Sequence, residues 1–343
     1  MGRKSPTLRD VGALAGVDPS TVSRLVNYDP RLSVSPETRE RILAAIEELG
    51  YRPNANARRL RLSRTMAVGY LIPDLVNPVN GPLVRGAQVR AGDAGYAILI
   101  GSSADSQESS RAFTELLGEG RVDGLLVNCG VMSDDEVLAL ATASAPVVLV
   151  NRSVQGARAS VVLQDEQAAA VGAAHLIDLG HRSVLHLAGP TYADTTQRRV
   201  RGFGAAMRAA GSSVHLQHAD DWTDGAGFAR AADALSQLRG EVTAVFADNV
   251  SLAIGVCSAA RGLGLSVPAD LSVLAMHDVP LAVHVTPSLT AIATPLEELG
   301  ATAFTLLHEM IAGKEPAAVT VVDGPAPRLI RRDSTAPPAT RPN

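Results

Sequence analysis

The chain has 343 residues, of which 46% are apolar and only 3% aromatic, and its formal net charge is −4. This length accommodates two or three domains, and an apolar set built from Ala, Val and Leu is typical of layered α/β folds. No basic segment followed by an apolar one opens the chain, and no apolar run reaches the roughly 18 residues of a membrane span. We therefore expect a soluble, cytoplasmic protein.

The charge is distributed unevenly along the chain. Residues 1–65 hold 12 Lys and Arg against 7 Asp and Glu, whereas the remaining residues hold 19 against 28. A basic head on an acidic body indicates that only the head meets a polyanion. A solvated basic surface is the simpler alternative.

Two short helices are predicted near the start of the chain. Apolar residues at positions 8, 11, 14 and 15 form a stripe at helical spacing, and Thr7 with Asp10 is an Asp version of the capping box. Gly16 can end this helix, and Pro19 suits the first turn of a second one. Two helices joined by a short turn that contains glycine are typical of a helix-turn-helix unit.

A third helix and a basic segment follow. The stretch SPETRERILAAIEELGY begins at Ser35 and predicts a helix that ends at Gly50. The next stretch, RPNANARRLRLSRT at residues 52–65, is too short to bury a core of its own. It is either a linker or a segment that folds only against a partner.

From Met66 onward, short apolar strands alternate with helices, and this pattern predicts parallel sheets buried on both faces. Two such series separate near Asp165, which suggests two similar doubly wound halves. The predicted helices lie near residues 83–94, 107–118, 133–144, 166–179, 195–210 and 250–262, with one more strand and helix within 289–316. Residues 334–343, STAPPATRPN, are expected to be disordered.

Several segments in one order resemble the LacI/GalR family of bacterial transcriptional regulators. They are the opening stretch, SPETRERILAAIEELGYRPNANARRLR, HLIDLGHRSVLHLAGP and FADNVSLAIG, and the agreement runs from about residue 7 to about residue 312. The resemblance implies a helix-turn-helix headpiece, a hinge helix, and a dimerising body like a periplasmic sugar-binding protein with two doubly wound parallel-sheet subdomains. Members of the family bind DNA operators and change their affinity with a small effector.

The implied domains are a headpiece at 1–51, a hinge helix or linker at 52–65 and an effector-binding core at 66–333. Within the core, we expect an N-subdomain at about 66–164 plus 292–318. The C-subdomain is expected at about 165–291 plus 319–333, and 334–343 is a disordered tail.

The resemblance assigns base-reading roles to the start of the second helix, at Pro19, Ser20 and Arg24. Arg24 can donate two hydrogen bonds to guanine, which discriminates against other bases by roughly 1–3 kcal/mol; a surface salt bridge is its alternative role. Phosphate contacts are expected from Thr7, Thr21, Ser23 and Asn27, although the two threonines are equally suited to capping helices.

In the hinge, Leu60 matches a leucine that the family wedges between base steps in the minor groove. Packing of Leu60 against its own body is the alternative. The positions that line that groove in the family are here Asn54, Ala57 and Arg59.

The carboxyl ends of the strands of two doubly wound halves surround a shared cleft, where ligands bind. The positions that match the family's effector site, or lie in the corresponding loops, are Asp74, Asn77, Asn80, Asp105, Arg199, Trp222 and Asn249. His277 stands where the family generally has an aspartate. A neutral His277 donates and accepts a hydrogen bond, whereas a protonated one beside Arg199 favours an anionic ligand. Trp222, the only tryptophan, either contacts the ligand or packs inside the protein.

We therefore expect a transcriptional regulator that binds double-stranded operator DNA as a homodimer. Repression is the expected outcome, and activation is the alternative. Its expected effector is a sugar or sugar derivative, with no cofactor, no metal and no membrane contact. A solute-binding protein without a regulatory role is one alternative. An enzyme is a weaker one, because no Gly-rich phosphate loop and no Gly-x-Ser-x-Gly elbow occurs. His215 and His218 lack a third metal ligand, and Cys129 and Cys257 are expected to be core thiols.

Overall fold

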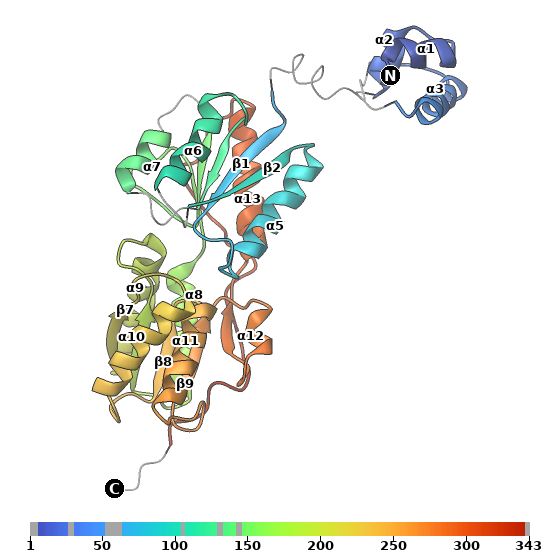
Figure 1. The fold of residues 1–343 in the computed structure, drawn as a ribbon. Coiled ribbons are helices and arrows are strands. Elements are labelled where there is room, and N and C mark those ends of the chain that lie inside the picture. The colour runs from blue at the N-terminus through green and yellow to red at the C-terminus, as the bar shows by residue number, and fades with distance from the viewer. Residues whose placement is uncertain are drawn as a thin grey trace. The chain divides into compact units, whose positions relative to one another are not determined.

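The computed structural model describes residues 6–26, 31–51, 64–103, 107–128, 133–141 and 146–339. The chain divides into two compact units, Met1–Arg64 and Thr65–Asn343, each described here by itself (Figure 1). Within the described ranges, no helix is long and apolar enough to cross a membrane.

The described residues of the first unit form three helices, α1 (Leu8–Ala15), α2 (Pro19–Val26) and α3 (Pro36–Leu49). The predicted capping box is present, because the Thr7 hydroxyl accepts from the Asp10 N–H while the Thr7 N–H donates to the Asp10 carboxylate. Gly16 ends α1 at a φ of 65°, where a side chain would be strained. One fully buried residue from each helix, Val11, Val22 and Ile42, forms the core of the unit. The helix-turn-helix prediction is confirmed.

The second unit contains two six-stranded sheets, which form a first and a second lobe. The first sheet has the order β11-β5-β4-β3-β1-β2 and is parallel throughout. Its strands are β1 (Ala67–Ile72), β2 (Ala97–Ser102), β3 (Leu125–Val127), β4 (Val147–Val150), β5 (Ser160–Val162) and β11 (Val319–Val321).

The second sheet has the order β12-β10-β9-β8-β6-β7, and only β12 runs antiparallel to its neighbour. Its strands are β6 (Ser183–Ala188), β7 (Ser213–His218), β8 (Ala244–Ala247), β9 (Ser272–Met276), β10 (Thr290–Ala293) and β12 (Arg328–Ile330). The predicted fold class, two doubly wound and mostly parallel sheets that follow a helical headpiece in the chain, is confirmed.

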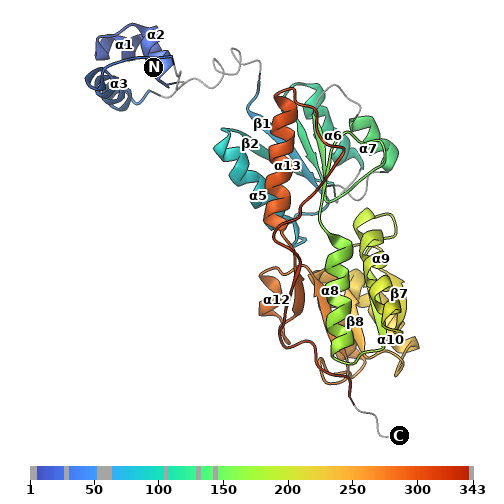
Figure 2. The ribbon, with the colours of Figure 1, turned by 180° about the vertical axis from the view of Figure 1, so that it is seen from behind.

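Helices cover both faces of each sheet (Figures 1 and 2). Alternation along β1 sends Tyr70 into the core beneath one pair of helices and Leu71 into the core beneath the other. The helices of the first lobe are α5 (Asn80–Asp93), α6 (Gln107–Gly118), α7 (Asp134–Ala141) and α13 (Leu296–Ile311). Those of the second lobe are α8 (Asp165–Asp178), α9 (Asp194–Ala209), α10 (Asp224–Gln237), α11 (Val250–Gly262) and α12 (Leu281–His284).

Helices α5 and α13 cross at glycines. A Cβ atom on Gly300 would lie 1.9 Å from the Leu83 carbonyl oxygen, and one on Gly86 would lie 1.9 Å from the Glu297 carbonyl oxygen. Since real Cβ atoms never approach a backbone oxygen so closely, the two helices can meet at this distance only with glycine at both positions.

The chain passes between the lobes three times: from β5 to α8, from β10 to α13, and from β11 to β12. These crossovers revise the expected subdomain limits. Val319–Val321 pairs with β5 and belongs to the first lobe, whereas residues 292–293 end β10 and belong to the second. The three-residue edge strand β11 pairs with β5, which lies far away in the sequence. No local sequence pattern predicts that pairing.

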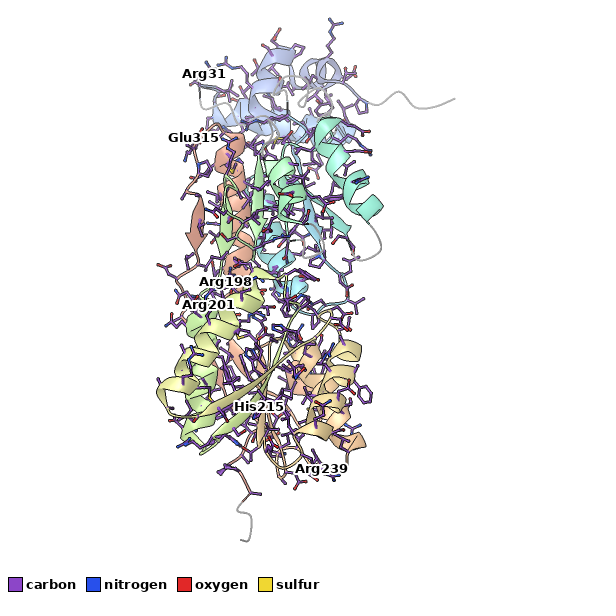
Figure 3. The ribbon with its side chains drawn as sticks, turned by 90° about the vertical axis from the view of Figure 1, so that its left-hand side faces the viewer. Arg31, Arg198, Arg201, His215, Arg239 and Glu315 are labelled. Carbon is purple, nitrogen blue, oxygen red and sulfur yellow. The ribbon has the colours of Figure 1, made fainter. Side chains whose placement is uncertain are left out.

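Four elements of the second lobe were not predicted: β7, α10, α12 and β12. The strand β7 lies at the edge of the sheet and carries the two histidines that were weighed as metal ligands; Figure 3 labels His215. The imidazole of His215 pairs with the Ser183 hydroxyl at 3.2 Å and that of His218 with the Gly189 carbonyl at 2.9 Å. Among the described residues, no group of three metal-binding side chains occurs.

The prediction of a disordered tail from residue 334 is wrong for its first residues. Ser334 is completely buried, donates to the Val273 carbonyl at 2.6 Å and accepts from the Thr290 N–H at 2.8 Å. The Thr335 hydroxyl pairs with His175, and the Ala336 carbonyl with His181. A polar segment rich in proline and alanine can thus be ordered by backbone groups at the ends of β9 and β10, which its composition does not reveal.

Candidate functional site

The candidate DNA-binding surface lies on α2. Val22 and Leu25 face the core, while Ser20 and Arg24, four residues apart, are exposed on the other side of the helix. The Ser20 N–H donates to the Asp18 carboxylate at 2.8 Å. A hydrogen bond from the Ser20 side chain, and then this one from its backbone, lower the pKa of Asp18. An anionic cap thus fixes the start of the helix whose first turns carry the predicted base-reading residues.

The other predicted DNA contacts are placed in part. Thr7 is exposed and its hydroxyl lies 2.7 Å from the Asp10 carboxylate, so its capping role is present. Pro19, Thr21 and Ser23 are half-buried. The remaining predicted contacts lie outside the described residues; they are Asn27, Asn54, Ala57, Arg59 and Leu60.

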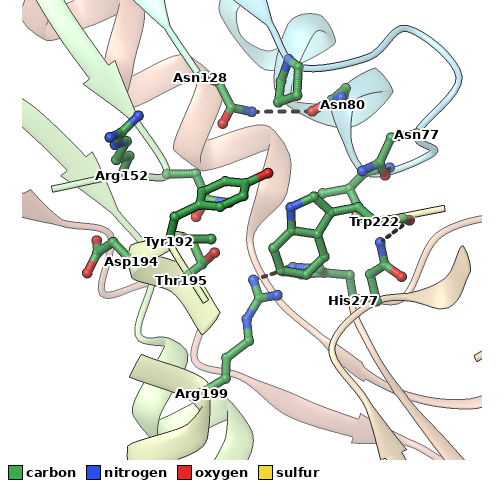
Figure 4. A pocket seen from close by; sticks show the side chains of 15 residues that line it. Asn77, Asn80, Asn128, Arg152, Tyr192, Asp194, Thr195, Arg199, Trp222 and His277 are labelled. Atoms are coloured by element: carbon green, nitrogen blue, oxygen red, sulfur yellow. Dashed lines mark hydrogen bonds between the residues drawn. The ribbon is translucent and has the colours of Figure 1, made fainter. Parts of the chain in front are cut away.

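The candidate effector site is a cavity of about 70 Å³ between the two lobes (Figure 4). Its lining residues follow the carboxyl ends of strands in both sheets, as expected for doubly wound folds. One water takes roughly 10–15 Å³ by the same kind of measure, so the cavity suits a small molecule and not a polymer. The lining residues are Pro73, Asn77, Val79, Asn80, Asn128, Asn151, Arg152, Tyr192, Ala193, Asp194, Thr195, Arg199, Trp222, Asn249 and His277.

Most of the predicted effector residues meet in this cavity. Asp74 instead lines an adjacent hollow at the mouth of the cleft, and Asp105 lies outside the described residues. Sequence reasoning missed several lining residues, among them Asn128 and Asn151. Both directly follow predicted strands, so their place in the sequence was a usable signal.

Arg199 occupies the floor of the cavity and is 2% exposed. Its guanidinium donates to the Asp165 carboxylate, the Asp248 carbonyl and the His277 imidazole, each at 2.8 Å. Burial raises the pKa of Asp165, but the charges of Arg199 and Arg198 outweigh it and the net shift is downward. Arg199 is therefore a fixed cation with a fixed counter-ion.

His277 is neutral. Burial, and then the charge of Arg199, lower its pKa to about 3, so the alternative of a protonated imidazole is wrong near neutral pH. Because a guanidinium only donates hydrogen bonds, Nε2 of His277 accepts from Arg199. The proton consequently sits on Nδ1, which lies 2.7 Å from the Thr294 hydroxyl.

A second group of charges joins the lobes beside the cavity. Asp194, at the start of α9, accepts from the Ser153 N–H of the chain beyond β4 at 2.9 Å and pairs with Arg198. Arg198 also binds Asp165 at 2.8 Å, and it lies where α9 faces the first lobe (Figure 3). On the first lobe, Arg152 pairs with Asp134 at 2.6 Å. The cations and carboxylates of the site balance one another.

Side-chain amides supply the remaining polar groups. Asn128 donates to Asn80 at 3.3 Å, and Asn80 donates to the Asp74 carbonyl at 2.6 Å (Figure 4). Asn249 is committed to the fold, since it caps α11 and donates to the Trp222 carbonyl. The Oδ1 atom of Asn151 is buried and has no partner among the described residues, so it is available to a ligand.

Trp222 lines the cavity and also packs inside the protein. Its ring lines the cavity and lies 5.7 Å from the guanidinium carbon of Arg199, a cation–π distance. It also packs closely on Gly189, where a Cβ atom would come within 2.1 Å of the ring. An aromatic face, amides and a neutralised cation suit an uncharged ligand with both donors and acceptors.

Comparison with known proteins identifies both units. Residues 7–54 match the family described as "Bacterial regulatory proteins, lacI family", and residues 173–335 match a periplasmic binding protein-like domain. The catabolite control protein A of Priestia megaterium is 33% identical over 96% of this chain and 99% of its own. The HTH-type transcriptional repressor PurR of Photobacterium profundum is 31% identical over 90% of this chain and 92% of its own.

Two solved structures are similar over nearly the whole chain. The lac repressor dimer bound to operator and the anti-inducer ONPF has a TM-score of 0.82 at 27% identity, covering 97% of this chain and 100% of that one. The complex of the transcriptional regulator CelR with cellobiose has a TM-score of 0.72 at 28% identity, covering 96% and 99%.

Proposed function

This chain belongs to the LacI family of bacterial regulatory proteins, and from that membership we propose that it represses transcription by binding a near-palindromic operator as a homodimer. A sugar or sugar derivative in the cleft between the lobes controls that binding. The protein binds its operator in the cytoplasm, where the DNA lies.

The proposed DNA contact is supported by the two faces of α2. Burial of Val22 and Leu25 orients the helix, so that Ser20 and Arg24 project from the unit together. The Arg24 fork suits guanine O6 and N7 in the major groove. Residues 54–60 lie outside the described residues, so the hinge contacts assigned to them rest on the family resemblance alone.

The observation that carries the effector proposal is the balanced charge of a cavity rich in amides. Arg199 and Arg198 are matched by Asp165 and Asp194, so an added anion would not find an unpaired cation among them. Sugar hydroxyls both donate and accept, as do the amides, and an aromatic ring such as Trp222 packs against the apolar face of a sugar. The cellobiose complex of the related CelR protein is consistent with this class.

A panel of sugars, nucleobases and organic acids tests the proposal through the melting temperature of the full chain. We expect stabilisation by one or more sugars, by RT ln(1 + [L]/Kd). An operator sequence is found by selecting, from random DNA, the duplexes that the protein binds. Binding of the selected duplexes by the Arg24→Ala variant serves as the comparison. Stabilisation by nucleobases or acids alone would overturn the sugar proposal, and the absence of any preferred duplex would overturn the DNA-binding proposal.

A further inference from the structure

A continuous chain of side chains, three of them buried and one half-buried, runs beneath the floor of the cleft. It consists of Asp165, Arg199, His277 and Thr294, and we call it the hinge chain. Its contacts are 2.8 Å from Arg199 Nε to Asp165 Oδ1, 2.8 Å from Arg199 Nη2 to His277 Nε2, and 2.7 Å from His277 Nδ1 to Thr294 Oγ1. Its first three members are at most 2% exposed.

Both ends of the hinge chain lie at crossovers between the lobes. Asp165 is the first residue of α8, immediately after the segment that leaves β5. Thr294 follows β10 and precedes Pro295, where the chain enters α13 and returns to the first lobe. The two middle members, Arg199 and His277, line the effector cavity.

The imidazole of His277 has no hydrogen-bonding capacity left for a ligand. A neutral imidazole has one acceptor and one donor. The acceptor, Nε2, is taken by Arg199, and the donor, Nδ1–H, is taken by Thr294. Although it lines the cavity, His277 therefore cannot hold a ligand hydroxyl as a carboxylate would.

We propose that His277 is a positioning residue, which orients Arg199. Through Arg199 and Asp165 on one side and Thr294 on the other, it joins the floor of the effector cavity to two of the three crossovers. A ligand that accepts a hydrogen bond from Arg199 thereby acts on the segments about which the lobes turn. At this part of the floor it meets N–H donors only, so the group it places there is an acceptor, such as a carbonyl or ring oxygen. The role of these contacts in effector control of DNA binding rests on the proposed function. The contacts that couple the cavity floor to the crossovers exist in the free protein.

Trp222 provides the measurement, since it is the only tryptophan and its ring lies 5.7 Å from the guanidinium of Arg199. We expect Thr294→Val to shift the Trp222 emission and to increase its quenching by acrylamide, because the released His277 no longer fixes Arg199. Thr294→Ser keeps the hydroxyl and should restore the spectrum of the unmodified protein. The matched control is Thr305→Val, at an exposed position on α13 whose hydroxyl bonds only within its own helix.

A second variant breaks the hinge chain in its middle. His277 has a φ of 66°, which asparagine tolerates better than most residues, so His277→Asn is the appropriate replacement. It should shift the Trp222 emission as Thr294→Val does, and the double variant should show no larger shift than either single one. In hydrogen exchange, both variants should speed the exchange of residues 165–168 about fivefold, as expected for the loss of one hydrogen bond.

The nitrogen spectrum of ¹⁵N-histidine-labelled full-length protein tests the tautomer directly. We expect a slowly exchanging proton on Nδ1 of His277 and no titration of this ring from pH 8 down to about pH 5. A proton on Nε2, additive shifts in the double variant, or an unchanged Trp222 spectrum in folded Thr294→Val would each overturn the proposal. None of these measurements uses DNA or effector, so their failure would leave the proposed function untouched.

Discussion

Replacing Ser334 by alanine removes two hydrogen bonds from the interior of the second lobe. The hydroxyl bridges β9 and β10, since it donates to the Val273 carbonyl at 2.6 Å and accepts from the Thr290 N–H at 2.8 Å. Both backbone groups would be left unsatisfied in a fully buried position. A buried unsatisfied group costs about 1–3 kcal/mol, so we expect Ser334→Ala to lower the free energy of unfolding by about 2–4 kcal/mol.

Thermal unfolding followed by circular dichroism measures this loss. For a folding unit of 150–250 residues, each kcal/mol lowers the melting temperature by roughly 2–4 °C, so the transition should fall by roughly 4–16 °C. The matched control is Ser236→Ala, because this exposed hydroxyl only donates to the Ala232 carbonyl of its own helix. It should change the free energy by less than about 0.5 kcal/mol. If the two variants melt together, the C-terminal segment is not part of the second lobe, and the reasoning fails.

Three further predictions concern the crossing helices, the helix proposed to contact DNA and the buried imidazole. Gly300→Ala must push α13 away from α5, since its Cβ would lie 1.9 Å from the Leu83 carbonyl oxygen. We expect the free energy of unfolding, measured in urea, to fall by at least about 1–3 kcal/mol. An unchanged urea midpoint would contradict the close crossing. Arg24→Ala should weaken binding to a selected operator by about 1–3 kcal/mol in gel-shift titrations and relax the preference at one base pair, whereas an equal loss on all duplexes would indicate a phosphate contact. The pKa of His277 is about 3 in the fold against 6.5 for an ordinary imidazole, so the unfolded chain takes up this proton first. The free energy of unfolding should therefore fall as the pH drops below about 6.5, and this group contributes about 1.4 kcal/mol per pH unit to the fall. Denaturant titrations at about pH 7 and about pH 5 measure this dependence, and it should be smaller in His277→Asn.

The headpiece was predictable because its signals are local. The capping box at Thr7 and the glycine at position 16 each act within one turn of helix, and the structure contains both. Of the predicted apolar stripe, Val11 and Ala15 are buried, whereas Leu14 is 47% exposed. The alternation of strands and helices after Met66 likewise follows from the burial of the central strands on both faces. The weakly apolar edge strand β7 lacked that signal and was missed.

The cleft was predictable in its location but only partly in its chemistry. Residues such as Asn128 and Asn151 belong to it because each ends a parallel strand, a rule that sequence can apply. The engagement of His277 could not be foreseen, because Asp165 lies 112 positions before it and their connection passes through Arg199. Such partners are set by the packing of α8, α9 and β9, and no spacing in the chain encodes them.

The three passages of the chain between the lobes have a consequence for how such proteins diversify. The head is one continuous segment ending at Arg64, so a single recombination event can transplant it onto another body. Neither lobe is continuous, since α13 and β11 return to the first after the second has been built. A lobe can be exchanged only by several simultaneous cuts, and new ligand preferences must therefore arise by substitution within an inherited body.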